Sequence, residues 1–326
     1  MLTRRSTIIS IATALAGLPA LSTQLVAQAT STPVKIVFPF AAGGGGDALS
    51  RLVAERLAPA LNRSVIVENR TGADGRIGIQ SVKAAAPDGD TLLLTTGPTM
   101  WLMALVHKAP GYDPFKDFEP VSHLAAFEFC IAVANTTGLT SVKALADWAR
   151  ANPDKATYGL PGVGTIPHFT GVAFSMLIGV DMRRLPYRGG ALAMNDLVAG
   201  QIPISIGTVA DALQQHRAGT IRILATTSKT RSPFLPDVPT MIESGYNLEG
   251  EAWYGLWAPA GTPAATVSRI SAAVAEALKD DSVRKRLEGL GLIPSGSTPA
   301  HLTEIMRNNT ARWSGIVTES GYTIDK

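Results

Sequence analysis

The stretch Val34-Lys-Ile-Val-Phe-Pro-Phe-Ala-Ala-Gly-Gly-Gly-Gly-Asp47 decides the fold of this chain. Its first five residues are apolar except for Lys35 and mostly β-branched, which predicts a buried strand. Gly43–Gly46 form a loop without side chains, and Asp47 opens a segment whose leucines keep helical spacing. A strand, a glycine loop and a helix start bring backbone N–H groups together at the positive end of a helix dipole. The stretch therefore predicts an anion site.

The following residues repeat the same alternation. Residues 65–69 and 91–95 predict two more strands, residues 78–86 a helix between them, and residues 96–99 a polar loop. Strand and helix in regular alternation favour an α/β fold, with a parallel sheet that has helices on both faces.

A second unit of the same kind lies further along the chain. Residues 156–159 predict a short strand that leads into Gly162-Val-Gly-Thr-Ile-Pro-His168 and then into a helix. Pro167 suits the first helical turn, because its missing N–H has no helical acceptor there. We expect the two glycine loops to close on one ligand.

The chain is expected to cross between two lobes twice. Residues 129–134 predict the strand that enters the second lobe, and residues 253–257 the strand that returns. The predicted division is lobe 1 at residues 30–127 plus 250–326, and lobe 2 at residues 128–249. Helices beginning near Thr262 and Thr298 complete the tail.

Residues 1–29 have the pattern of a cleaved signal peptide. Arg4 and Arg5 precede the apolar run 8–18, and Ala27-Gln-Ala29 is a small-x-small cleavage motif. The apolar run is too short to span a bilayer as a membrane anchor. The arginine pair leaves Sec and twin-arginine export both open. We expect a soluble periplasmic protein after cleavage.

Composition excludes several classes of protein. The 326 residues are 46% hydrophobic and 17% charged with a formal charge of +3, which is typical of a globular protein and offers no basic tract for nucleic acid. The single cysteine, Cys130, has apolar neighbours and predicts a buried strand thiol.

Two kinds of catalytic site compete with a binding site. Gly43-Gly-Gly-Gly-Asp-Ala48 fits the dinucleotide pattern G-x-G-x-x-A, and Glu68 lies near the place of a ribose-binding acid. An exported Rossmann-type NAD(P) oxidoreductase is therefore the alternative hypothesis, although it leaves the second glycine loop without a role. The five histidines show no metal-ligand spacing, and no G-x-S-x-G motif is present. We expect no cofactor, no metal and no catalysis.

Several segments taken in order resemble one known family. They are Pro39–Asp47, Val65–Arg70, Ala86–Gly89, Tyr112–Phe118, Gly164-Thr165 with His168, Pro186–Gly189, and Trp253–Gly261. Together they resemble the Bug-type extracytoplasmic solute receptors of tripartite tricarboxylate transporters, over essentially the whole chain after residue 29.

The resemblance implies a two-lobed periplasmic binding protein, type II-like, which holds a small carboxylate in the cleft between its lobes. It also implies membrane transporter subunits as partners, and we expect a monomer. The ligand contacts that it implies are Phe40, Ala41, Ala42, Gly43, Gly44, Gly45, Gly46, Asp47, Thr96, Gly97, Thr99, Gly164, Thr165 and His168, with Tyr187 nearby. For His168, a position in the core is as good an interpretation as a ligand contact. For Asp47, the alternative to a ligand contact is a helix-capping role.

The first glycine loop departs from the family pattern. Ala42 stands where the family has proline, and Gly45 and Gly46 stand where it often has hydroxyl residues. The loop therefore offers fewer hydroxyl contacts, and the ligand, whether di-, tri- or aromatic carboxylate, stays open. A sensor pathway in place of a transporter also stays open.

Overall fold

The opening stretch folds largely as its pattern predicts. The computed structural model describes residues 32–40, 42–43, 45–187 and 189–323, and in it β1 (Val34–Phe38) is followed by α1 (Gly45–Leu61). The helix begins at Gly45 and not at Asp47. Residues 1–29, Ala41 and Gly44 lie outside the described residues, and the described residues group as one compact unit.

The first half of the sheet is parallel. β1 lies between β2 and β3 and pairs with both of them in parallel. The residues expected to form a loop at 96–99 instead begin a helix, because Thr96 caps it and Pro98 suits its first turn. The elements of this half after α1 are β2 (Val65–Asn69), α2 (Arg76–Lys83), β3 (Thr91–Thr96) and α3 (Gly97–Val106).

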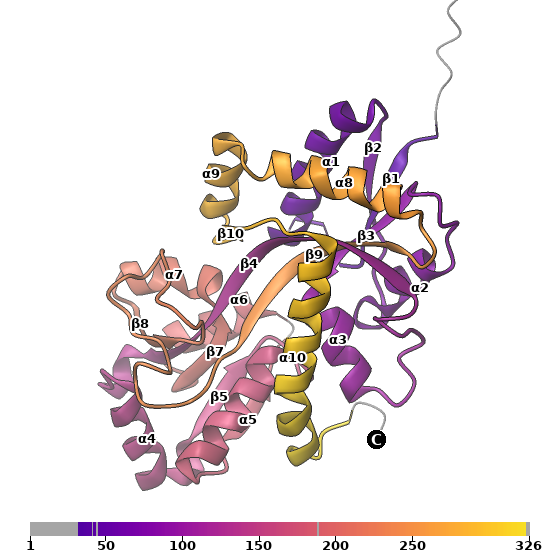
Figure 1. Cartoon of the computed structure of the whole chain (residues 1–326). Helices are drawn as coiled ribbons and strands as arrows, with labels where there is room; N and C mark the ends of the chain where they lie inside the picture. The colour runs from indigo at the N-terminus through magenta and orange to yellow at the C-terminus, as the bar shows by residue number, and fades with distance from the viewer. Residues whose placement is uncertain (1–31, 41, 44, 188, 324–326) are drawn as a thin grey trace, which may run out of the picture. The chain divides into compact units, whose positions relative to one another are not determined.

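One long strand, β4 (Phe118–Ala134), runs through both halves of the sheet. Its first part pairs antiparallel with β9 (Glu251–Pro259) and its last part with β7 and β8. Figure 1 shows β4 and β9 lying side by side along the middle of this unit. The crossing predicted at residues 129–134 is thus only the end of a strand that begins at Phe118, and β4 joins the two expected sheets into one.

The second half repeats the parallel arrangement. β5 pairs in parallel with β6 and with β7, so the described residues form one ten-stranded sheet with the order β2-β1-β3-β9-β4-β7-β5-β6, and β8 and β10 pair with β4. The elements are α4 (Val142–Ala151), β5 (Thr157–Leu160), α5 (Ile166–Ile178), β6 (Arg183–Pro186), α6 (Gly190–Val198), β7 (Ile204–Thr208), α7 (Val209–Arg217) and β8 (Ile221–Thr226).

The tail contains one helix more than predicted. Asp280 caps this extra helix by accepting hydrogen bonds from two backbone N–H groups. The tail elements are α8 (Ala264–Ala277), α9 (Asp281–Gly289), β10 (Ile293–Pro294) and α10 (Pro299–Glu319). The last helix lies across β4 and against α3 (Figure 1).

Apolar side chains fill both faces of the sheet. In the first half, α1 and α8 pack against one face of β1, while α2, α3 and α10 pack against the other. In the second half, α4 and α5 cover one face, and α6 and α7 cover the other. Cys130 lies in β4 as a buried free thiol, as predicted, and burial raises its pKa. The predicted α/β layering is confirmed.

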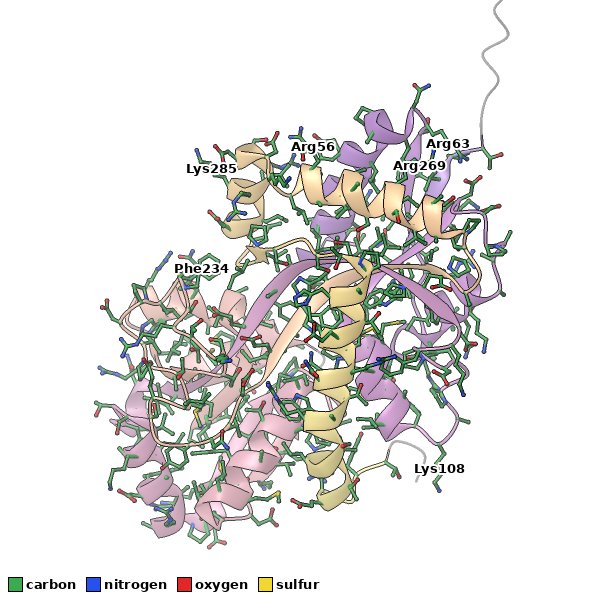
Figure 2. All side chains as sticks on the ribbon, in the orientation of Figure 1. Arg56, Arg63, Lys108, Phe234, Arg269 and Lys285 are labelled. Carbon is green, nitrogen blue, oxygen red and sulfur yellow. The ribbon has the colours of Figure 1, made fainter. Side chains whose placement is uncertain are left out.

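Charged side chains lie at the outside of this unit (Figure 2). Arg56 on α1 pairs with Asp280 at 3.6 Å, which ties α1 to the start of α9. Among residues 32–323 that the structure describes, we find no helix with both the length and the apolar character needed to cross a bilayer.

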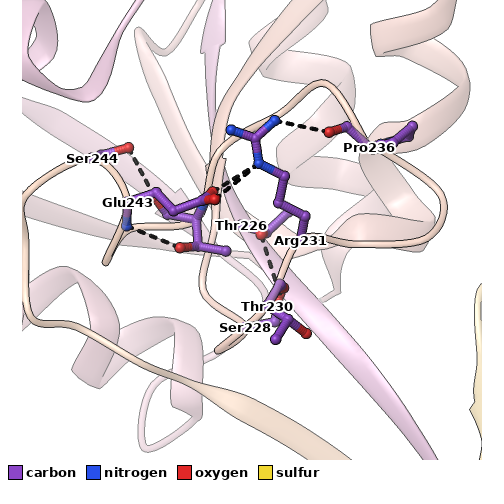
Figure 3. Close-up of polar contacts among 8 residues, drawn as sticks. Thr226, Ser228, Thr230, Arg231, Pro236, Glu243 and Ser244 are labelled. Carbon is purple, nitrogen blue, oxygen red and sulfur yellow. Dashed lines mark hydrogen bonds and ion pairs between the residues drawn. The ribbon is translucent and has the colours of Figure 1, made fainter.

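A polar network holds the long connection between β8 and β9 (Figure 3). Arg231 donates to both carboxylate oxygens of Glu243, at 3.1 and 2.9 Å, and to the carbonyl of Pro236 at 3.0 Å. The same carboxylate accepts from the N–H of Thr240, and these contacts lower the pKa of Glu243. The connection is therefore fixed without a helix or strand of its own.

Candidate functional site

A cavity of about 710 Å³ brings together residues that are far apart in the sequence. Its lining includes the starts of α3 and α5, the middle of β4, and Tyr322 after α10. The cavity therefore takes residues from both halves of the sheet, at two helix N-termini that carry positive dipole ends.

The start of α3 is built from the sequence Thr96-Gly-Pro-Thr99. The Thr96 hydroxyl accepts from the N–H of Thr99 at 3.2 Å, and the two threonine hydroxyls lie 2.6 Å apart. Pro98 contributes no N–H. In the first turn this leaves Gly97 as an amide without an acceptor in its own helix.

The start of α5 has the same construction. Thr165 caps it by accepting from the N–H of His168 at 3.4 Å, and the Thr165 hydroxyl donates to the carbonyl of Gly162 at 2.7 Å. Pro167 again removes one amide, which leaves that of Ile166 without a helical acceptor. The repeat of Thr-x-Pro in α3 and α5 was not recognised from sequence, although it is visible there.

His168 holds the second glycine loop from behind. Its side chain is fully buried and is absent from the described cavity lining, whereas Gly164 and Thr165 line the cavity. Its Nδ1 accepts from the N–H of Gly164 at 3.1 Å, and its ring packs against Phe169 and Tyr322 with centroids 4.7 Å apart in each case. Burial, and secondarily the positive charge of a nearby arginine, lowers its pKa to about 4, so the ring is neutral near pH 7.

Gly164 suits its position because its backbone adopts a conformation that residues with a side chain rarely adopt. Its φ of 73° lies in the left-handed region, where a side chain is strained. This conformation points its N–H at His168, so that amide is already engaged.

The first glycine loop reaches the cavity through Phe40. Phe40 lines the cavity, while Ala42 and Gly43 are exposed and are not among its lining residues. Gly46 is buried, and a Cβ there would lie 2.5 Å from the ring of Phe38. Gly45 has open space at the same position. Gly97 likewise packs against the indole of a tryptophan on β9.

Asp47 holds its own loop in place. Its carboxylate accepts from the N–H of Gly43 at 3.0 Å, from Arg51 at 3.0 and 3.1 Å, and from the Asn69 amide at 3.0 Å. These hydrogen bonds, the one from Arg51 first, lower its pKa. Asp47 is buried and is not among the residues that line the cavity.

Tyr187 lines the cavity at the end of β6. Its hydroxyl donates to a carboxylate oxygen of Asp196 at 2.6 Å. Partial burial, and then this carboxylate, raises the pKa of Tyr187 to about 12.

The rest of the lining was missed from sequence. It is mostly apolar, contains one acid and one tyrosine, and includes Leu102, Met103, Phe127, Phe129, Val163, Asp74 and Tyr322. Most of them lie on elements whose pattern indicates core, and only the tertiary fold turns them toward the glycine loops. The sequence did contain one indication of this lining. Phe127 and Phe129 are two positions apart, and residues at that spacing in a strand lie on the same face of the sheet.

The described residues contain no group of three or more His, Cys, Asp or Glu side chains placed to hold a metal ion. The titratable side chains in the described lining are Asp74, Tyr187 and Tyr322.

A mixed α/β sheet with an open cavity at two helix starts suits the capture of a small anionic ligand. Residues 49–322 match the TctC family, described as tripartite tricarboxylate transporter family receptors. The protein BugT of Bordetella pertussis is 30% identical over 292 residues, which cover 89% of this chain and 89% of BugT.

Solved structures agree with the family match. The periplasmic binding protein BugD superposes with a TM-score of 0.76 at 34% identity, covering 89% of this chain and 98% of BugD. The Rhodopseudomonas palustris protein Rpa4515, solved with adipate, gives a TM-score of 0.79 at 32% identity, covering 89% and 98% of the two chains. This chain belongs to the TctC family of tripartite tricarboxylate transporter receptors, and the predicted resemblance and fold class are confirmed.

Proposed function

We propose that this protein captures a small organic carboxylate in the periplasm and delivers it to the membrane subunits of a tripartite tricarboxylate-type transporter. The observation that carries the proposal is the cavity at the starts of α3 and α5, which presents two helix N-termini to one space. A carboxylate there would accept from backbone N–H groups and interact favourably with both dipoles.

The proposed contacts follow the geometry. Phe40, Thr96, Thr99, Gly164, Thr165 and Tyr187 line the cavity and are proposed to meet the ligand directly. Gly46, Asp47 and His168 are proposed to support the loops, because their contacts are with other parts of the protein. Gly97 packs its Cα against a tryptophan and is proposed to offer its backbone N–H to the ligand. Ala42, Gly43 and Gly45 are proposed to approach the ligand only on closure.

The protein is proposed to act as a monomer with two lobes, residues 30–127 plus 250–326 and residues 128–249. β4 and β9 would then be the strands that cross between them, and closure would be a hinge motion at these strands. The leader at residues 1–29 is proposed to direct export. No catalysis and no cofactor enter this mechanism.

A thermal-shift screen tests the proposal. Malate, adipate, hexanoate and 3-phenylpropionate are added to the purified protein, with NAD as the probe for the alternative oxidoreductase. A ligand at about 100 times its dissociation constant adds about 2.7 kcal/mol to the stability of the folded state. We expect a shift with at least one carboxylate and none with NAD. The reverse result would refute the receptor proposal.

A further inference from the structure

The cavity is more apolar than a site for a small, highly charged acid requires. Its walls include Leu102 and Met103 from α3, Phe127 and Phe129 from β4, and Val163 from the second glycine loop. Val163 lies between two glycines and is 41% exposed. An apolar side chain left open at a binding loop gains free energy when an apolar ligand covers it.

Most hydroxyl groups of the cavity are already engaged as donors. One of the Thr96 and Thr99 hydroxyls donates to the other, Thr165 donates to a backbone carbonyl, and Tyr187 donates to a carboxylate. The N–H of Gly164 is engaged with His168. A ligand with many oxygen atoms would therefore find few donors here without breaking internal hydrogen bonds.

Two amides remain at the helix starts by the geometry of the first turn. They are those of Gly97 and Ile166, because a proline follows each of them and the next amide is capped by threonine. Two such donors, one from each helix start, match the two oxygens of one carboxylate.

The charges around the cavity also favour a ligand with a single carboxylate. Among the described residues that line the cavity there is no Lys, Arg or His, while Asp74 contributes a negative charge. Asp74 is exposed, and with its neighbour Ala73 it lies in the left-handed region, at φ of 56° and 47°. A second carboxylate on the ligand close to Asp74 would be repelled by it, and no described lining residue carries a positive charge to offset that repulsion.

Resting on the proposed function, we infer that the preferred ligand is a monocarboxylate with an apolar, preferably aromatic, body, and that Asp74 discriminates against dicarboxylates. The carboxylate lies at the starts of α3 and α5. The apolar body lies against Phe127, Phe129 and Val163, where aromatic rings stack with aromatic neighbours.

Hexanoate and adipate make a matched pair of probes, because they share a six-carbon chain and differ by one terminal carboxylate. By titration calorimetry we expect hexanoate to bind at least tenfold more tightly than adipate, and 3-phenylpropionate more tightly than either. If adipate binds as tightly as hexanoate or more so, this inference is overturned while the receptor function stands. If no carboxylate binds, both are overturned.

The variant Asp74→Asn isolates the charge. Asparagine tolerates the left-handed conformation, so the loop is expected to keep its shape. Adipate affinity should rise at least threefold, and hexanoate affinity should stay within twofold of the wild type. Asp154→Asn removes an exposed acid that is absent from the described lining and should change neither. An unchanged hexanoate-to-adipate ratio in Asp74→Asn would overturn the role of Asp74.

Discussion

Replacing Thr165 with valine removes the hydroxyl that begins α5 and keeps the side-chain shape. That hydroxyl accepts from the N–H of His168 at 3.4 Å and donates to the carbonyl of Gly162 at 2.7 Å. Loss of an N-cap acceptor costs about 1 kcal/mol, and loss of the donor to a carbonyl costs about as much again. We therefore expect the free energy of unfolding to fall by about 1–2 kcal/mol, and the Tm to fall by about 2–4 °C for each kcal/mol.

Binding should fall further than stability explains. The same hydroxyl fixes the carbonyl of Gly162 and the amides around Ile166, where the proposed carboxylate lies, so we expect at least a tenfold loss of affinity for whichever of hexanoate and adipate binds the wild type. Misplacement of backbone donors weakens a short charge-assisted hydrogen bond steeply.

Thr298→Val provides the matched control. Thr298 also caps a helix that begins with proline, accepting from the N–H of His301 at 3.3 Å, and it is absent from the described lining of the cavity. Urea unfolding should show a cap loss of about 1 kcal/mol in this variant, and calorimetry should show unchanged binding. Equal affinity in wild type and Thr165→Val, or an equal loss in both variants, would refute the role given to the start of α5.

Two further predictions concern stability. Gly46→Ala places a Cβ 2.5 Å from the ring of Phe38, so the free energy of unfolding measured in urea should fall by about 1–3 kcal/mol. Gly45→Ala has open space at its Cβ and should change that free energy by less than about 0.5 kcal/mol. Similar values for both variants would show that the ring of Phe38 moves aside. The pKa of His168 is about 4 in the folded protein against an ordinary value of 6.5, so the unfolded chain takes up the proton first and stability should fall by up to about 3 kcal/mol as pH drops from 6.5 to 4. Unfolding measured at several pH values should show a shallower fall in His168→Gln, and an identical fall would assign it to other groups.

Local sequence predicted the first strand and the glycine loop before α5 well, whereas Gly45 and Gly46, expected in the first glycine loop, begin α1. Val34–Phe38 is nearly all apolar and is bounded by Pro33 and Pro39, so local pattern and tertiary environment favour the same structure there. The same holds for Cys130, whose apolar neighbours predicted its burial.

The sequence pattern gave the wrong element where the same residues are common in two kinds of structure. Thr96 to Thr99 contains glycine and proline, which mark turns, but threonine before x-Pro is also a helix start. β4 was predicted too short because Pro120, His123 and Glu128 break its apolar pattern, yet pairing with β9 at one edge and with the tail strand β10 at the other holds this part of the strand.

The cavity itself could be only half predicted. Phe40 and Thr165 were expected from their glycine loops, and they line it. Met103 and Tyr322 lie on or after helices whose local pattern indicates nothing but packing. Their arrival at the same space depends on how α10 packs against β4 and how α3 packs against α10 and β9, which no local period encodes.

The long strand β4 also limits how the chain length can vary. Its pairing shifts register between Pro120 and Ser122, between His123 and Ala125, and between Ile131 and Ala132. Residues 126–128 pair with β9 without a shift, and Phe129 and Cys130 pair with β7. Because successive strand residues point to opposite faces, deletion of Glu128 would make Phe127 and Phe129 neighbours and turn one of them away from the cavity. Insertions and deletions among homologous receptors should therefore collect at the three bulges and spare the five residues between them.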